Sequence, residues 1–298
     1  MRIAVMGAGA VGCYFGARLH QAGHQVTLIG RAALAEAVAA RGLHLTMRGF
    51  DGFLPIEASV SPQAARGAQL LLFCVKSGDT ESAGAALLPL LGPECTVLSL
   101  QNGVDNAGRL AAVLGREVIP AAVYVAVEMA APGHVLHHGR GEILMGQTSG
   151  SEALARTLND AGIPATVTAR VEDALWGKLT VNCVYNALSA LVQLTYGELL
   201  DQPGMREVMH DVFEECWQVA AASGVSLPEN LWDEVLGVGV SMAGQRSSTA
   251  QDVARGRHSE IDYINGHIVR QGARVSAATP VNRCLHSLVS AKDNQVPI

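Results

Sequence analysis

The first twelve residues carry the feature that most constrains the fold of this chain. A short apolar segment, Arg2–Met6, leads directly into a G-x-G-x-x-G pattern. Beyond the pattern, the apolar spacing over Val11–Ala22 is that of a helix. A strand, a glycine-rich turn and a helix in this order are typical of a nucleotide-binding βαβ unit. The six residues of the pattern are Gly7, Ala8, Gly9, Ala10, Val11 and Gly12.

Each glycine of this pattern has its own physical purpose. Gly7 permits the tight turn, Gly9 lets the backbone approach a pyrophosphate, and Gly12 allows the helix to pack closely on the strand. The pyrophosphate would lie at the helix N-terminus, where free N–H groups and the helix dipole favour an anion. The pattern alone is a weak signal, but its setting between a strand and a helix favours a dinucleotide site over a simple glycine turn.

Strand and helix patterns alternate up to about residue 168, and helical patterns dominate after Arg170. Such alternation predicts a doubly wound, mostly parallel Rossmann sheet, followed here by a second, all-α domain. We therefore expect an NADP-binding Rossmann domain over residues 1–168 and a helical substrate or dimerisation domain over residues 169–298. The predicted strands are Arg2–Met6, Gln25–Ile29, Gln69–Val75, Thr96–Leu100, Ala121–Glu128, Gly141–Met145 and Ala165–Thr168, the last two as edge strands, with a hairpin inserted over Leu43–Val60.

Composition excludes several classes of protein. Of the 298 residues, 49% are hydrophobic and only 16% are charged, which indicates a compact globular protein. The formal net charge is −6 and there is no basic run, so neither a nucleic acid nor a membrane surface is an expected partner. No apolar stretch approaches the ~20 residues of a membrane span, and the N-terminus does not resemble a signal peptide. We expect a cytoplasmic protein, as a monomer or a homodimer.

A metal site is not expected from the sequence. The six cysteines are scattered, and none forms a C-x-x-C pair or a cluster with zinc-ligand spacing. His134, His137 and His138 lie close together, but no carboxylate or thiol stands at ligand spacing from them. Ordinary surface histidines are the simpler interpretation.

The end of the second predicted strand indicates which dinucleotide is bound. An NAD site usually has Asp or Glu there, to hold the ribose 2′-hydroxyl. This strand ends in Ile29-Gly30-Arg31, and the next acidic residue is Glu36. A guanidinium at position 31 suits a 2′-phosphate, and Lys76, just beyond another buried strand, would add a second charge. The sequence favours NADP(H); the alternative is that both cations are simply solvated.

Lys178, Asn182 and Asn186 are spaced four residues apart in a segment with helical periodicity. On a helix these three side chains form one stripe, and apolar residues such as Leu179 and Leu188 flank it. A lysine and two amides beside a packed surface need polar partners, and a bound substrate would provide them. A solvated helix face is the alternative. Ser247, Ser248 and Glu260 form a later polar group, for which helix capping and solvation are equally simple explanations.

Taken together, these motifs resemble the ketopantoate reductase (2-dehydropantoate 2-reductase) family over nearly the whole chain. Each motif is unremarkable by itself, whereas their order and spacing are specific. The resemblance rests on Gly7–Gly12, Gly30-Arg31, Val75-Lys76, Gln101-Asn102-Gly103, Trp176-Gly177-Lys178-Leu179, Asn182, Asn186, Ser247-Ser248, Gln251-Asp252, Gly256-Arg257, Glu260-Ile261-Asp262 and Thr279-Pro280.

The resemblance implies NADPH-dependent reduction of the 2-keto acid 2-dehydropantoate (ketopantoate) to pantoate, in pantothenate biosynthesis. It implies that Lys178 is the catalytic acid and that Asn102 helps to position it and the nicotinamide. It further implies that Asn182 and Asn186 contact the substrate. By the same resemblance, Ser248 binds the carboxylate of the keto acid, Glu260 orients the distal hydroxyl, and Arg31 and Lys76 hold the 2′-phosphate of NADPH.

The chain departs from the family pattern at two positions near the expected substrate. Tyr196 stands where well-known members have asparagine, and Thr249 stands where they often have methionine. These departures leave the identity of the keto acid open. One alternative is an NADP-dependent reductase of another 2-keto acid, or an enzyme like the 3-hydroxyacid dehydrogenases. A non-catalytic NADP-binding regulatory protein is a second alternative, which the joint presence of Lys178, Asn102 and Glu260 opposes.

Overall fold

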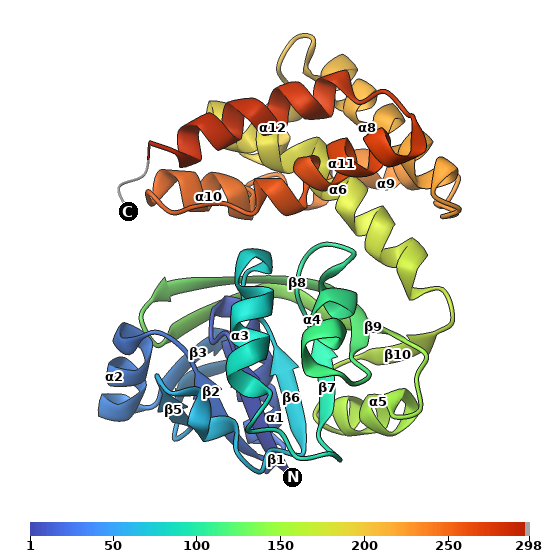
Figure 1. Cartoon of the computed structure of the whole chain (residues 1–298). Coiled ribbons are helices and arrows are strands. Elements are labelled where there is room, and N and C mark those ends of the chain that lie inside the picture. Colours follow the sequence, from blue (N-terminus) through green and yellow to red (C-terminus); the bar gives the residue numbers. More distant parts are fainter. Residues whose placement is uncertain (296–298) are drawn as a thin grey trace. The chain divides into compact units, whose positions relative to one another are not determined.

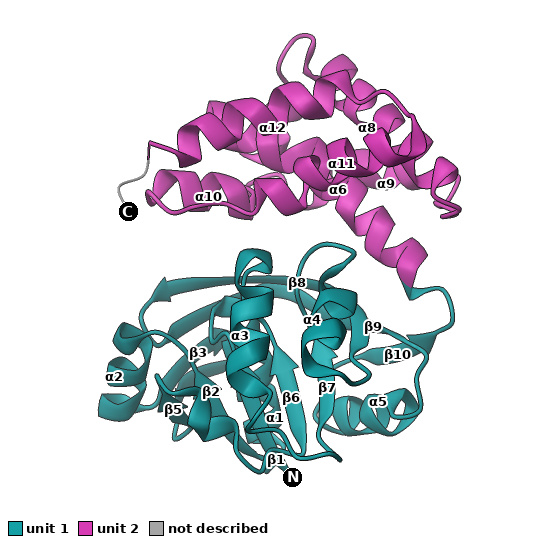
Figure 2. Ribbon diagram, in the orientation of Figure 1, with its two compact units in different colours: residues 1–171 teal, residues 172–298 magenta. Residues whose placement is uncertain are grey.

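The computed structural model describes residues 1–295. The chain divides into two compact units, Met1–Val171 and the residues from Glu172 onward (Figure 2). Sequence patterns placed this boundary at residues 168/169. The first unit contains a ten-stranded sheet with helices packed on it, and the described part of the second unit, residues 172–295, contains no strand. The predicted class, a Rossmann sheet followed by an all-α domain, is confirmed.

Parallel strands form one side of the sheet in the first unit (Figure 1). The strand order is β4-β3-β9-β8-β7-β6-β1-β2-β5, and β10 pairs with β9 outside this path. All pairings from β8 to β5 along this order are parallel. The strands are β1 (Arg2–Met6), β2 (Gln25–Ile29), β3 (Leu43–Met47), β4 (Phe50–Leu54), β5 (Glu57–Ser59), β6 (Leu70–Phe73), β7 (Thr96–Ser99), β8 (Ile119–Ala131), β9 (His134–Gly146) and β10 (Ala165–Thr168).

Both faces of this parallel part are covered, which explains why its inner strand β6 is apolar at every position. In β6, Leu70 and Leu72 belong to one hydrophobic cluster, together with residues of α1 and α5. The alternate residues Leu71 and Phe73 belong to a second cluster, with residues of α3 and α4. The helices of this unit are α1 (Ala10–Gln21), α2 (Ala32–Arg41), α3 (Thr80–Leu87), α4 (Asn106–Leu114) and α5 (Ser151–Asp160), with short 3-10 helices η1 (Pro62–Ala65) and η2 (Ser77–Asp79).

The sheet differs from the sequence prediction at β8 and β9. These strands form one long antiparallel hairpin, and β9 is an interior strand that also pairs with β3 and β10. The prediction of an edge strand over Gly141–Met145 was therefore wrong. Register shifts interrupt the hairpin, and Gly139, Arg140 and Gly141 all have positive φ. Because such bulges break the period-two alternation, the sequence pattern shows only the ends of these strands.

The predicted hairpin over Leu43–Val60 is confirmed in part. Strands β3 and β4 pair antiparallel, and Gly49 turns between them with φ +82°. The last part of this segment, β5, leaves the hairpin and pairs parallel with β2 at the other edge of the sheet.

Helix α6 (Val171–Val192) forms the centre of the second unit. Most of its side chains from Leu175 to Ala190 are buried. The other helices are α7 (Tyr196–Leu200), α8 (Met205–Ala222), α9 (Leu231–Ser241), α10 (Ser248–Ala254), η3 (Ile261–Tyr263), α11 (Asn265–Val275) and α12 (Pro280–Asp293). No helix within residues 1–295 combines the length and the apolar character needed to cross a membrane.

A buried carboxylate joins two of these helices. Glu215 of α8 is only 8% exposed and accepts hydrogen bonds from the backbone N–H groups of Val281 (2.7 Å) and Asn282 (2.9 Å). It also accepts from the Asn282 side-chain amide at 2.8 Å. These N–H groups belong to the first turn of α12, which has no intrahelical partners for them. Glu215 therefore caps α12, and its negative charge lies at the positive end of the helix dipole.

We expect Glu215→Ala to lower the free energy of unfolding by about 2–3 kcal/mol, because buried N–H groups would lose their acceptor. Urea denaturation followed by circular dichroism measures this change. Glu214→Ala is the matched control, since the neighbouring carboxylate is half-exposed and lies 3.8 Å from the His210 ring nitrogen in a weak ion pair. Equal destabilisation by both variants would show that Glu215 is not a cap of special importance.

Candidate functional site

Four strands of the first unit end at the same level of the sheet. Met6 of β1 is in register with Ile29 of β2 and with Phe73 of β6, and Phe73 is in register with Ser99 of β7. The residues that follow these strands therefore lie along one carboxyl edge, which is where open α/β sheets bind ligands. The predicted dinucleotide residues all come directly after these strands: Gly7–Gly12, Arg31, Lys76 and Asn102.

The structure explains the outer glycines of the loop between β1 and α1. A Cβ atom on Gly7, which has φ +93°, would collide with the backbone of Cys74 and Val75. One on Gly12 would lie 2.7 Å from the carbonyl oxygen of Gly7 and 2.8 Å from Val5. The Gly7 and Ala8 N–H groups both donate to the carbonyl of Ile29 at 3.0 Å. The loop is thus held between the ends of β2 and β6.

The middle of the same loop is open. A Cβ atom on Gly9 would have no other atom within 4 Å, so a ligand can approach the backbone there. Gly9 is the N-cap of α1, and no side chain caps this helix or places an acidic group in its first turn. An uncapped helix N-terminus behind an open glycine is the arrangement that suits a phosphate group.

Arg31 occupies the N-cap position of α2 and is exposed. Gly30 precedes it and donates its N–H to the carbonyl of Ser59 at 3.0 Å. A Cβ atom on Gly30 would lie 3.0 Å from the Cβ of Ala8, so this glycine allows the end of β2 to approach the glycine loop. Arg31 is consequently near that loop, at the position where the sequence predicted a phosphate-binding cation.

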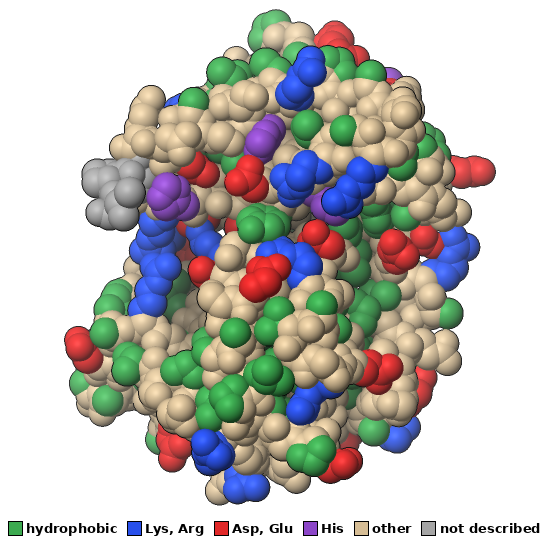
Figure 3. All heavy atoms as spheres, viewed as in Figure 1, with side chains coloured by type: hydrophobic (Ala, Val, Ile, Leu, Met, Phe, Trp, Pro, Cys, Tyr) green, Lys and Arg blue, Asp and Glu red, His purple; other side chains and the backbone are tan. Residues whose placement is uncertain are grey.

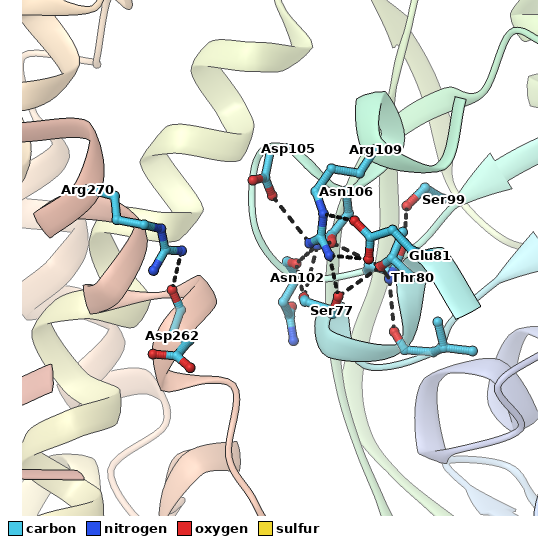
Figure 4. Close-up of polar contacts among 12 residues, drawn as sticks. Ser77, Thr80, Glu81, Ser99, Asn102, Asp105, Asn106, Arg109, Asp262 and Arg270 are labelled. Carbon is cyan, nitrogen blue, oxygen red and sulfur yellow. Dashed lines mark hydrogen bonds and ion pairs between the residues drawn. The ribbon is translucent and has the colours of Figure 1, made fainter. Parts of the chain in front are cut away.

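Lys76 and Asn102 lie on the loops that follow β6 and β7, and both are partly buried. The carbonyl oxygen of Asn102 accepts hydrogen bonds from Asn106 and from Ser77, the latter at 3.2 Å. Gly103 follows with φ +98°, a conformation that favours glycine. The two loops are therefore connected to each other through the Asn102 backbone (Figure 4).

In the second unit, Lys178, Asn182 and Asn186 lie on α6 at helical spacing, as predicted. Lys178 and Asn182 are partly buried, and Asn186 is only 3% exposed. The end of the stripe at Asn186 is therefore not a solvated helix face.

Helix α10 is fixed to α6 beside this stripe. The Ser247 hydroxyl donates to the carbonyl of Asn186 at 3.2 Å, and the Ser247 N–H donates to the Ser189 hydroxyl at 3.3 Å. Ser247 is also the N-cap of α10, since its oxygen accepts from the Ala250 N–H. Its neighbour Ser248 is exposed. Of the two serines, Ser247 is the structural cap, and the side chain of Ser248 can face a ligand.

Glu260 lies just before η3, in a segment held by two later helices. Asp293 accepts hydrogen bonds from the backbone N–H (3.1 Å) and hydroxyl (2.6 Å) of Ser259, directly beside Glu260. On the other side, the Asp262 carboxylate contacts His286, and the Asp262 carbonyl accepts from Arg270 at 2.6 Å (Figure 4). The segment continues into α11, where Asn265 donates to the carbonyl of Cys183 on α6 at 3.1 Å.

Tyr196, one of the two departures from the family pattern, is the first residue of α7. Its ring packs against that of Tyr185, with centroids 4.6 Å apart, and burial raises its pKa. Its N–H donates to the carbonyl of Gln245 at 2.9 Å. Thr249, the other departure, is buried in α10. Position 196 thus carries an aromatic side chain where well-known family members have asparagine.

Other reactive side chains are not arranged for chemistry. Within residues 1–295, no group of three or more His, Cys, Asp or Glu side chains is placed to hold a metal ion. Cys13 lies below the glycine loop, and burial raises its pKa to about 12, so the thiol stays protonated and weakly nucleophilic. His134, His137 and His138 lie on β9. His134 stacks on His44, and His137 stacks on Tyr14.

Sequence reasoning missed the polar residues that support the two loops carrying Lys76 and Asn102. Besides Asn106, they include Ser77, Thr80 and Arg109, and the hydrogen bonds among them connect the segments after β6 and β7. Their only signal in the sequence is a run of polar residues after each apolar strand, which resembles an ordinary solvated loop.

The surface charge agrees with the composition. On the face shown in Figure 3, basic and acidic side chains are interspersed over both units. The net charge of −6 adds no electrostatic attraction for a polyanion.

Comparison with known proteins supports the combination of fold and residues. Two family models match the chain: "Ketopantoate reductase PanE/ApbA" over residues 3–150 and its C-terminal counterpart over residues 170–293. A 2-dehydropantoate 2-reductase from Archaeoglobus fulgidus is 32% identical over 294 residues, covering 97% of this chain and 96% of the relative.

Solved structures agree over the full length. A PanE/ApbA family ketopantoate reductase from Ralstonia eutropha JMP134 is 50% identical with a TM-score of 0.96, and 99% of each chain is covered. D-mandelate dehydrogenase, solved with NADH and anilino(oxo)acetate, has a TM-score of 0.93 at 25% identity and 100% coverage of both chains.

The fold and the residues at its sheet edge define an oxidoreductase with a Rossmann unit and a helical unit. The family matches extend over both units, and both the Archaeoglobus relative and the Ralstonia eutropha structure carry the name of that family. The chain belongs to the ketopantoate reductase family.

Proposed function

We propose that this protein is an NADPH-dependent 2-keto acid reductase that converts 2-dehydropantoate to pantoate, with Lys178 as the general acid. The observation that carries the proposal is the open, uncapped glycine loop beside Arg31 at one carboxyl sheet edge, in a chain that also carries the Lys178–Asn182–Asn186 stripe. The names of the full-length relatives support the same activity.

The first unit has the features that a dinucleotide requires. Gly9 leaves room for the pyrophosphate, and the first turn of α1 offers N–H groups without a competing side-chain cap. Arg31 has no acidic neighbour in the first turn of α2, so a 2′-phosphate would meet no opposing charge from that turn. Arg31 and Lys76 together favour NADPH over NADH, because only NADPH carries this additional phosphate.

Bound NADPH would supply a hydride for the carbonyl carbon of the keto acid. The chain must then stabilise and protonate the carbonyl oxygen, on which negative charge develops. The Lys178 ammonium can do both, because it is a positively charged donor that can release a proton. Its partial burial strengthens this interaction, since charges attract more strongly where water is excluded.

The remaining residues would bind and orient the keto acid. The exposed hydroxyl of Ser248 at the first turn of α10 suits the substrate carboxylate. Asn182 and Asn186 continue the polar stripe from Lys178, and Asn102 would orient the nicotinamide side. Glu260 would accept a hydrogen bond from the distal hydroxyl of 2-dehydropantoate, on a segment that Asp293 holds in place.

A second candidate activity is reduction of a 2-keto acid with an apolar or aromatic substituent. It is favoured by Tyr196, whose ring stands where the family pattern has an amide. The likeness to D-mandelate dehydrogenase, a protein solved with an aryl-containing oxo acid, supports the same class of substrate. Comparing kcat/KM for 2-dehydropantoate and for phenylglyoxylate with NADPH decides between the two substrates.

We expect Lys178→Ala to lower kcat about 10²- to 10⁴-fold, the usual contribution of a general acid, while NADPH still binds. Lys178→Arg should also be impaired, because a guanidinium keeps the charge but does not release its proton. Steady-state kinetics and a fluorescence titration with NADPH measure the two properties. Lys292→Ala, on α12, is the control. Turnover near that of the wild type in Lys178→Ala would eliminate the assigned role.

Arg31→Ala should weaken binding of NADPH about 10- to 100-fold and leave binding of NADH nearly unchanged, because only the former loses a charge-assisted contact. Dissociation constants from calorimetry test this difference. Arg66→Ala is the control, since Arg66 is exposed and lies on the opposite, amino edge before β6. An equal loss for both dinucleotides would mean that Arg31 does not select between them.

Glu260→Ala should raise KM for 2-dehydropantoate about 10- to 100-fold, because the distal hydroxyl loses a charged acceptor. Trimethylpyruvate is the matched substrate, since it lacks only that hydroxyl, and its KM should hardly change. If both KM values rise together, Glu260 does not recognise the hydroxyl.

A further inference from the structure

One polar network, buried at its centre, joins the two loops that carry Lys76 and Asn102. Some of its side chains belong to the loops, and the others come from the end of β7 and from helices α3 and α4 (Figure 4). We call it the loop network. Its members are Ser77, Thr80, Glu81, Ser99, Gln101, Asn106 and Arg109.

The central members of the loop network are shielded from water. Ser77 and Thr80 are fully buried, Asn106 is 2% exposed and Gln101 is 5% exposed. Uncharged polar groups in such positions must be hydrogen-bonded to one another, because each unpaired group would destabilise the fold. The geometry of the network is therefore strongly determined.

The amide of Gln101 has one permitted orientation. Its nitrogen must face the carbonyl of Val75, which can only accept, so its oxygen faces the Ser99 hydroxyl, which donates to it at 3.1 Å. That nitrogen donates to the Thr80 hydroxyl at 2.8 Å and to the carbonyl of Val75 at 3.1 Å. Gln101, at the start of the second loop, is thereby tied to the residue that precedes Lys76 in the first.

The amide of Asn106 is oriented by a charge. Arg109 can only donate hydrogen bonds, and its Nη1 lies 3.0 Å from the Asn106 oxygen. The Asn106 nitrogen must then face the opposite side, where it donates to the Ser77 hydroxyl at 3.0 Å and to the carbonyl of Asn102. This nitrogen is a direct connection between the two loops.

Arg109 is itself held firmly. Its guanidinium donates to both carboxylate oxygens of Glu81, at 2.7 and 2.6 Å, and its Nη2 donates to the carbonyl of Ser77 at 3.0 Å. These hydrogen bonds hold the pKa of Glu81 below its usual range, so the pair is ionised at neutral pH. The guanidinium of Arg109 thus holds the loop of Lys76 through Ser77, and it holds the loop of Asn102 through Asn106.

We propose that Asn106 and Arg109 are positioning residues, which hold the backbone of both loops so that Lys76 and Asn102 meet the dinucleotide in a fixed orientation. This inference rests on the proposed function, in which these two side chains face the cofactor. A loop that is already ordered loses less conformational entropy when a ligand binds, so the network contributes to affinity as well as to folding.

The test is Asn106→Asp, an isosteric change. The new carboxylate keeps an oxygen toward Arg109 but presents a second oxygen to the carbonyl of Asn102, so a hydrogen bond becomes a repulsion. Asn159→Asp is the matched control. The Asn159 amide nitrogen also donates to two backbone carbonyls, those of Ala155 and Ala165, both at 2.8 Å, but it lies on the more exposed helix α5 of the same unit.

We expect Asn106→Asp to weaken NADPH binding about tenfold or more and to speed amide hydrogen exchange in residues 76–79 and 102–105. Asn159→Asp should change neither quantity. Arg109→Lys, a milder variant that keeps the charge and loses the fork, should give an intermediate loss of affinity. If Asn106→Asp and Arg109→Lys bind NADPH as tightly as the wild type, the proposal is overturned.

The outcome also separates this inference from the proposed function. A wild-type protein that binds NADPH but reduces neither keto acid would refute the proposed reaction, while the affinity and exchange measurements would still decide the role of the loop network. Normal turnover of the wild type with unaltered loops in both variants would refute the network alone. A wild type that binds neither NADPH nor NADH would overturn both.

Discussion

The in-register ends of four parallel strands are the constraint on which the cofactor half of this protein depends. Hydrogen bonding between β2, β1, β6 and β7 places Ile29, Met6, Phe73 and Ser99 at one level. The residues that follow must therefore emerge along one edge, whatever their separation in the sequence. Apolar packing on both faces fixes the strands. The strands in turn position the glycine loop, Arg31 and the loops that carry Lys76 and Asn102.

The sequence predicted the part of the molecule that local rules determine. Continuous apolar runs and the glycine pattern were sufficient for the parallel strands, the first helix and the change to helices after Arg170. The β8–β9 hairpin was misjudged, because its bulges near Arg140 remove the alternation by which strands are recognised. Strand β5 was likewise hidden in the predicted hairpin, since three residues carry too little pattern to show which partner they choose.

The candidate site, like the fold, was predicted from the sequence only in part. The residues proposed to face a ligand could be selected from the sequence: Arg31 because no acidic residue directly follows the second strand, and Lys178 because it forms a polar stripe with two amides beside apolar positions. The residues behind them could not, because Asn106 and Arg109 resemble ordinary polar positions until the fold buries one and pairs the other. Of the two serines at α10, only the structure shows which one is the cap. Long-range hydrogen bonds of this kind have no signature in a single sequence.

The distribution of thiols has a practical consequence for spectroscopy. Four of the six cysteines are buried, and burial raises the pKa of Cys74, beneath the glycine loop, so that its thiol stays protonated. Cys284, on α12, is exposed. A maleimide dye should therefore attach at one defined place in the helical unit without prior mutagenesis. Such a label would give an optical report on that unit, separate from any signal of the bound nucleotide.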